Sequence, residues 1–312
     1  MPGAGRFVAE GVIPATLVAF DDDFGINVAE SRRHLRHVAN VGGLSAITVN
    51  GHASEIHAFT LAEQQSLLVE SLNEVGNELP LVNGVYADGS AAAVEVARMA
   101  AREGASALLV FPPNSMSMGG QLRPDMAVRH FKMIADATDL PLILFQYPAT
   151  TGLGYPFATM LQIFDEVPSV VAIKDWCNDP MLHEKHIRTF QSLPRKVNVL
   201  STHSSWLMAS LSMQPAGLLS GAGSVIADLQ VELFNAMTVN DLAKARTVNE
   251  RIYPVAQAFY AAPFLDMHNR MKECLVLLGR LNQAVVRPPL IKLSEAEIAG
   301  LRGALVAAGL LN

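Results

Sequence analysis

Residues 141–175 read PLILFQYPATTGLGYPFATMLQIFDEVPSVVAIKD, and their pattern indicates the fold. A strand-sized run that is apolar up to Phe145 covers 142–146, and residues 155–165 have helical periodicity. A second run, apolar over 170–173 and ended by Lys174, covers 170–174. Short apolar runs that alternate with longer helical stretches are typical of parallel strands joined by helices. This stretch therefore predicts one complete strand–helix–strand unit.

The same alternation extends outward in both directions. It predicts eight strands, at 12–18, 46–50, 80–85, 107–111, 142–146, 170–174, 197–201 and 217–220. Helices are predicted between them near 28–41, 61–76, 88–103, 124–137, 155–165, 180–191, 204–213 and 228–237. Eight such units predict an α/β fold of the (β/α)₈ TIM-barrel type over residues 1–240, with 241–312 as a helical extension packed on the barrel.

An open, doubly wound sheet is the structural alternative to the barrel. Such a sheet would carry a glycine-rich nucleotide loop after its first strand. The chain reads VAFD at 18–21, so nothing there would hold a phosphate group, and the barrel is favoured.

Composition excludes several classes of function. Half of the 312 residues are hydrophobic, and the formal net charge is −6 without a basic cluster, which argues against nucleic acid as a partner. The longest apolar runs are strand-sized, so we expect no membrane span. Cys177 and Cys274 lack metal-ligand spacing, and no leader precedes the first strand, so we expect a cytoplasmic protein without a metal or organic cofactor.

Catalytic residues of a barrel lie at the carboxyl ends of its strands. Lys174 ends the apolar run 170–173, and burial at the mouth of the barrel would lower its pKa and free the amine to attack a carbonyl carbon. Alternatively, Lys174 pairs with Asp175 and only closes the strand.

Several segments together resemble the dihydrodipicolinate synthase and N-acetylneuraminate lyase family. They are GHASE at 51–55, FQYPATTG at 145–152, AIKD at 172–175, and MKECL at 271–275 with VRPPL at 286–290. The resemblance runs in order from about residue 11 to 310. It implies a barrel with a C-terminal helical extension, usually a homotetramer. It also implies a class I aldolase in which Lys174 forms a Schiff base with pyruvate or a longer 2-oxo acid.

The departures from the family pattern bear on the reaction. The family's G-[ST]-T-G-E loop reads GHASE here, which leaves Ser54 as the nearest hydroxyl for the substrate carboxylate. Phe145 stands where the family has a proton-relay tyrosine, Pro113 lies at or near the place of a second one, and Thr150 stands where the synthases have an arginine. A dehydratase or aldolase acting on a 2-keto-3-deoxy sugar acid or a similar compound is therefore favoured. A dihydrodipicolinate synthase and a non-catalytic 2-oxo acid binding barrel remain alternatives.

The missing relay tyrosine needs a substitute. His52 titrates near neutrality and lies on the loop facing the imine, and Tyr147 is the second choice. His52 could also be a loop histidine bonded to the backbone. His183 and His186 are expected on the solvated face of a helix, not around a metal. Further substrate contacts are expected at Gly51, Ala53, Ser54, Phe145, Thr150, His203, Ser220 and Gly221.

Overall fold

The computed structural model describes residues 7–312; residues 1–6, which begin the predicted barrel range, lie outside the described part. Eight parallel strands form one sheet in the order β1-β8-β7-β6-β5-β4-β3-β2. Single parallel bridges from Val12 to Leu44 and from Ala15 to Thr48 join β1 to β2 and close the barrel, which confirms the predicted (β/α)₈ fold. The strands are β1 Gly11–Pro14, β2 Ile47–Val49, β3 Leu81–Val85, β4 Ala107–Val110, β5 Leu142–Gln146, β6 Val170–Asp175, β7 Asn198–Ser201 and β8 Gly217–Ser220.

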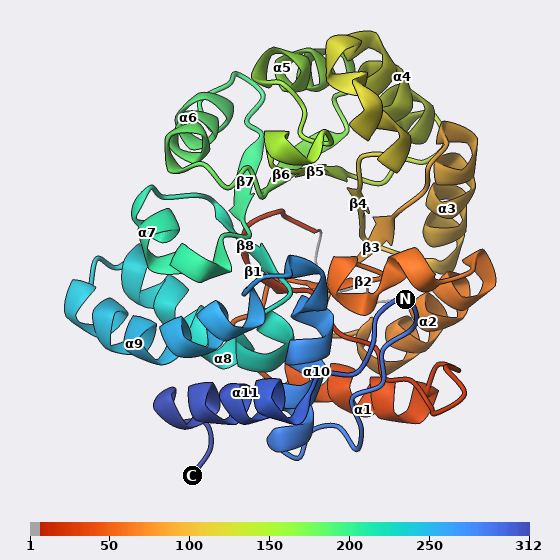
Figure 1. Ribbon diagram of the computed structural model, residues 1–312. Helices are drawn as coiled ribbons and strands as arrows, with labels where there is room; N and C mark the ends of the chain where they lie inside the picture. The colour runs from red at the N-terminus through yellow and green to blue at the C-terminus, as the bar shows by residue number, and fades with distance from the viewer. Residues whose placement is uncertain (1–6) are drawn as a thin grey trace.

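The eight helices α1 to α8 surround the strands as a ring (Figure 1). They are α1 Val28–Ala39, α2 Leu61–Val75, α3 Ser90–Glu103, α4 Pro124–Ala135, α5 Phe157–Glu166, α6 Pro180–Phe190, α7 Leu207–Ser212 and α8 Gly223–Thr238. The start of α2 shows how local sequence sets an element. The Thr60 side chain accepts from the backbone N–H of Glu63, and the Glu63 carboxylate accepts from the N–H of Thr60, a capping box.

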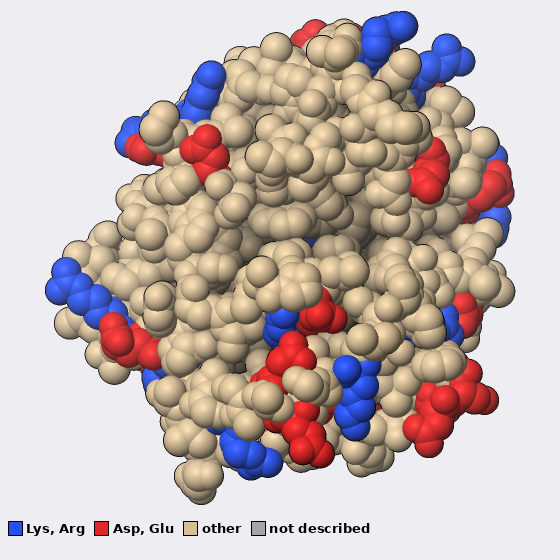
Figure 2. Space-filling model, viewed as in Figure 1, with Lys and Arg blue, Asp and Glu red and all other residues tan. Residues whose placement is uncertain are grey.

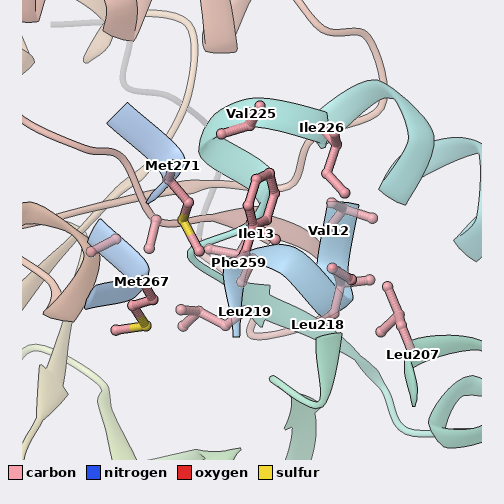
Figure 3. Packing of buried hydrophobic residues seen from close by; sticks show 14 of the residues in the cluster. Val12, Ile13, Leu207, Leu218, Leu219, Val225, Ile226, Phe259, Met267 and Met271 are labelled. Carbon is pink, nitrogen blue, oxygen red and sulfur yellow. The ribbon is translucent and has the colours of Figure 1, made fainter. Parts of the chain in front are cut away.

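The chain after α8 adds α9 Leu242–Phe259, α10 Met267–Leu277 and α11 Glu295–Ala307. Figure 1 shows these blue helices gathered beside α8 and α1. In Figure 3, Phe259 of α9 and Met271 of α10 lie close to Ile13 and Leu219, and all four belong to one buried cluster. Packing of these apolar side chains joins the extension to the barrel.

A buried ion pair fixes the extension to the loop that follows β2. Lys272 of α10 donates to a Glu55 carboxylate oxygen at 2.5 Å, and both side chains are almost fully buried. The backbone N–H of Arg287 donates to the other Glu55 oxygen at 3.0 Å. Glu55 closes the short 3₁₀ turn η1 (His52–Ser54), so the C-terminal helices hold this loop in place.

Two element bounds differ from the sequence prediction by four residues or more. The first strand ends at Pro14, well before residue 18. Ala15 and Thr16 still donate single backbone hydrogen bonds to β8 and β2, but the Leu17 N–H donates to the side chain of Ser224, so strand pairing does not continue to residue 18. The last barrel helix begins at Gly223, five residues before the predicted start. Its first turns are buried on nearly every side, so they carry no helical periodicity to read. No helix of residues 7–312 is long and apolar enough to cross a membrane.

Candidate active site

A cavity of about 200 Å³ opens among the carboxyl ends of the strands, and side chains from the barrel and from the extension line it together. The lining residues are His52, Ala53, Phe145, Lys174, Trp176, Asn178, Thr202, His203, Ser204, Ser205, Trp206, Gly221, Tyr260, Phe264, Met267 and Met271. This lining contains one lysine and no arginine or carboxylate. Figure 2 shows a hollow near the centre of the viewed face, bordered mainly by uncharged residues, with charged residues nearer the edge and the lower part.

Lys174 lies near the end of β6 with only 4% of its surface exposed. Its Nζ atom is 4.1 Å from the centre of the Phe145 ring, and the two residues are partners in the β5–β6 register. Burial lowers the pKa of Lys174 from 10.5 to about 7, because the charged form loses its hydration. Among residues 7–312, no carboxylate forms an ion pair with this amine. The alternative that Lys174 pairs with Asp175 is therefore not what the structure shows.

Asp175, the next residue, points away from Lys174 into a separate polar cluster. Its Oδ2 atom accepts hydrogen bonds from Nδ1 of His183 and Nδ1 of His186, both at 2.8 Å, and its Oδ1 accepts from the Cys177 N–H at 3.0 Å. These two histidines hold the pKa of Asp175 well below its usual range, against the effect of burial.

The prediction of a solvated helix face for His183 and His186 was wrong, because both side chains are fully buried. A buried carboxylate needs hydrogen-bonding partners, and α6 turns its histidines inward to supply them. Their sequence spacing did not distinguish this inward face from a solvated one.

The polar cluster also contains the one group of potential metal ligands found among the described residues. Asp175, Cys177, His183 and His203 place a ligand atom each within 4.8 Å of one another. Most of these atoms nevertheless have hydrogen-bonding partners: Nε2 of His183 pairs with the Ser210 hydroxyl at 2.8 Å, and the Cys177 thiol donates to the Asp179 carbonyl at 3.3 Å, whereas Nδ1 of His203 has no partner among the described residues. Burial raises the pKa of Cys177, which favours the neutral thiol. We interpret the cluster as a hydrogen-bond network that fixes the end of β6.

His52 lies in the turn after β2 and lines the cavity. Its pKa is lowered well below 6.5, first by burial and then by repulsion between its charged form and the charged forms of His268 and Lys174. His268 of α10 holds this turn, since its Nε2 pairs with the carbonyl oxygen of His52 at 2.7 Å. The imidazole is therefore a neutral base that faces the same space as Lys174.

Other residues predicted for the site divide into two groups. Ala53, Phe145, His203 and Gly221 line the cavity, whereas Gly51, Ser54, Tyr147, Thr150 and Ser220 do not. The Ser54 hydroxyl donates to the Thr16 carbonyl at 2.7 Å and accepts from the Gly51 N–H, so its hydrogen bonds stabilise the loop. Thr150 is exposed. The Ser220 hydroxyl pairs with that of Ser204 at 2.7 Å, just behind the lining.

Tyr147 lies one residue past β5, in an aromatic cluster. Its ring centre is 4.6 Å from that of Phe145 and 5.1 Å from that of Trp176. Burial raises the pKa of Tyr147, which disfavours the phenolate. The ring packs behind Phe145, whose own ring is the one that lines the cavity.

Sequence reasoning missed much of the aromatic lining. Trp176 follows Lys174 by two residues, and its position directly after a strand end would have predicted that it lines the site. Tyr260 and Phe264 belong to the extension, for which the strand-end rule makes no prediction. Their contribution depends on how α9 and α10 pack over the barrel mouth.

Comparison with known proteins gives the family. The model of the dihydrodipicolinate synthetase family matches residues 8–308. The chain belongs to this family. It is 28% identical to an uncharacterised DapA-like lyase of Halobacterium salinarum, with 99% of this chain and 98% of that protein covered. It is 27% identical to a 4-hydroxy-tetrahydrodipicolinate synthase of Symbiobacterium thermophilum, over the full length of both.

Solved structures of the family share the fold. YagE, a prophage protein of the family from E. coli K12 solved in complex with pyruvate, has a TM-score of 0.89 at 22% identity and covers 97% of this chain and 99% of its own. A monomeric dihydrodipicolinate synthase variant also gives 0.89 at 22% identity, with 99% of both chains covered. The predicted family and barrel are thus confirmed, and the chain is a lyase of the dihydrodipicolinate synthetase family.

Proposed function

We propose that Lys174 forms a Schiff base with a 2-oxo acid. One observation supports this most strongly: a buried amine without a carboxylate partner faces the cavity, with its pKa lowered to about 7. At neutral pH about half of such amines are uncharged and can add to the ketone carbon. Loss of water then gives a protonated imine, which draws electrons from the neighbouring carbon. YagE, a relative with the same fold, was solved with pyruvate.

We further propose cleavage or dehydration of a 2-keto-3-deoxy sugar acid or a similar compound. In the aldolase reaction His52 takes the proton of the substrate hydroxyl, the adjacent carbon–carbon bond breaks, and its electron pair moves into the imine to give an enamine. His203 lies on the same cavity and would contact the distal end of the substrate. Tyr147, whose phenol is set back from the cavity, is the second choice as proton carrier.

The synthase that condenses pyruvate with aspartate semialdehyde is the second candidate, because relatives such as the Symbiobacterium thermophilum protein carry that name. Phe145 lines the cavity where a relay phenol would be expected, and the cavity lining contains no arginine for a second carboxylate. Both observations favour cleavage or dehydration of a 2-oxo acid over condensation with aspartate semialdehyde. A barrel that binds 2-oxo acids without turnover is the third candidate.

Trapping of the imine tests the proposal. The protein is incubated with pyruvate and with a panel of longer 2-oxo acids, treated with borohydride, and measured by intact mass. The wild type should gain the mass of the reduced adduct, Lys174→Ala should gain none, and Lys196→Ala, an exposed control, should behave as the wild type. A wild type without any adduct would refute the proposal.

A turnover screen then separates the three candidate functions. Fast condensation of pyruvate with aspartate semialdehyde would make the synthase the favoured function, and adducts without product would indicate a binding protein.

We also propose a cytoplasmic homo-oligomer. Both cysteines are free and buried, which fits a reducing compartment. The family resemblance implies a tetramer, although one structural neighbour is a monomeric variant. Light scattering of the purified chain at several concentrations measures the assembly directly.

A further inference from the structure

A tyrosine of the C-terminal extension reaches the cavity from the side of α9. Tyr260 directly follows α9 and lines the same cavity as Lys174. The preceding residue, Phe259, is fully buried against the barrel, and the Phe264 ring stacks on Tyr260 with centres 5.5 Å apart. Two neighbouring side chains therefore fix where the phenol points.

The phenol oxygen of Tyr260 belongs to a small hydroxyl network. It accepts a hydrogen bond from the Ala222 N–H at 3.1 Å, so its own proton remains free to donate. The hydroxyls of Ser204 and Ser220, themselves 2.7 Å apart, neighbour it and act with this amide to lower its pKa, while burial has the larger, opposite effect. At neutral pH the group is a protonated phenol with donors in place to hold a phenolate.

The loop after β8 brings this phenol towards the rest of the site. Gly221 lies between the two walls of the cavity, where a Cβ added to this glycine would lie 3.8 Å from the Tyr260 oxygen and 3.3 Å from the Cβ of Ala53. A side chain at this position would be tightly confined, because the contact with Ala53 is closer than most Cβ contacts in proteins. The Tyr260 oxygen and the His52–Ser54 turn thus face each other across Gly221.

We propose that Tyr260 is the general acid of imine formation, in place of the phenol that Phe145 lacks. The inference rests on the proposed Schiff-base function. Addition of Lys174 to the ketone gives a neutral carbinolamine. Tyr260 then donates its proton to the carbinolamine hydroxyl, the carbon–oxygen bond breaks, and water leaves, which gives a protonated imine and a phenolate held by the Ala222 amide. When water later adds to the product imine, the phenolate takes a proton from that water and the phenol is restored.

The test compares Tyr260→Phe with Tyr253→Phe, a matched control that removes an exposed phenol from α9, the helix that Tyr260 follows. Borohydride is added at successive times after pyruvate, and the adduct is counted by intact mass to give the rate of imine formation. Loss of a positioned acid should slow imine formation about 10²–10⁴-fold in Tyr260→Phe and leave the control unchanged. The final trapped fraction should stay the same, because a catalyst does not move the equilibrium.

Ser204→Ala is the second variant, because it leaves the ring packing intact even if Tyr260→Phe does not fold. Loss of this neighbouring hydroxyl, which helps to lower the pKa of the phenol, should slow imine formation about tenfold. If the wild type is trapped and every variant that folds forms the imine at a rate within about threefold of it, Tyr260 is not the general acid. The Schiff-base function would then still stand. A wild type that is never trapped would overturn the Schiff-base function and this inference together.

Discussion

Replacing Lys174 with methionine should abolish the imine and make the protein more stable. The pKa of Lys174 is about 7 in the folded chain and 10.5 for a free side chain, a difference of about 3.5 pH units. Below pH 7 both states are protonated, and folding then carries the full cost of burying the charge, about 5 kcal/mol at 1.36 kcal/mol per unit. Between pH 7 and 10.5 only the unfolded chain holds the proton, so this cost shrinks as pH rises.

The linkage relation gives the magnitude at two pH values. The gain in stability from Lys174→Met should be about 5 kcal/mol near pH 6 and about 2 kcal/mol near pH 9, a difference of about 3 kcal/mol. The measurement is the free energy of unfolding by urea for both proteins at both pH values. Lys196→Met, at an exposed position, is the control and should stay within about 0.5 kcal/mol of the wild type. A gain that does not change with pH, or a less stable Lys174→Met protein at pH 6, would refute the reasoning.

Two further predictions concern the loop after β2. His52→Gln should lower kcat about 10²–10⁴-fold with imine formation unchanged, and a kcat within about threefold in steady-state assays would make the histidine a bystander. Glu55→Gln breaks the buried pair with Lys272 and should cost about 3–5 kcal/mol of stability in urea unfolding, whereas Lys244→Met, which breaks an exposed pair with Glu232, should cost at most about 1 kcal/mol. Equal effects of these two substitutions would contradict the importance of burial.

The sequence predicted what depends on local pattern. Strand positions follow from short apolar runs, and seven of the eight predicted strands fall within two residues of their observed bounds at each end. Lys174 stood out because a charged residue ended such a run, and the structure places it on the cavity. The exception, strand one, does not reach its predicted end, because the Leu17 N–H donates to the side chain of Ser224, 207 positions away in the chain. No local window contains that contact.

The missed parts of the site depend on packing between distant segments. His183 and His186 lie on a helix whose polar residues suggested a solvated face, yet Asp175 makes that face an interior one. Tyr260 enters the site because α9 ends beside the β8 loop. The Ser54 hydroxyl was expected to bind the substrate carboxylate, but it donates to the Thr16 carbonyl, a contact that the local sequence does not indicate.

The adjacent residues Lys174 and Asp175 carry opposite charges, yet the structure keeps the electrostatic effect of one from reaching the other. Consecutive side chains of a strand point to opposite faces, so the amine enters the cavity while the carboxylate enters the space beneath α6. Hydrogen bonds from two histidines satisfy the carboxylate, and burial alone accounts for the lowered pKa of Lys174. Had Asp175 faced the amine, the attraction would have raised the lysine pKa and kept the amine charged. The histidine pair on α6 therefore supports the reactivity of Lys174 without touching the cavity amine.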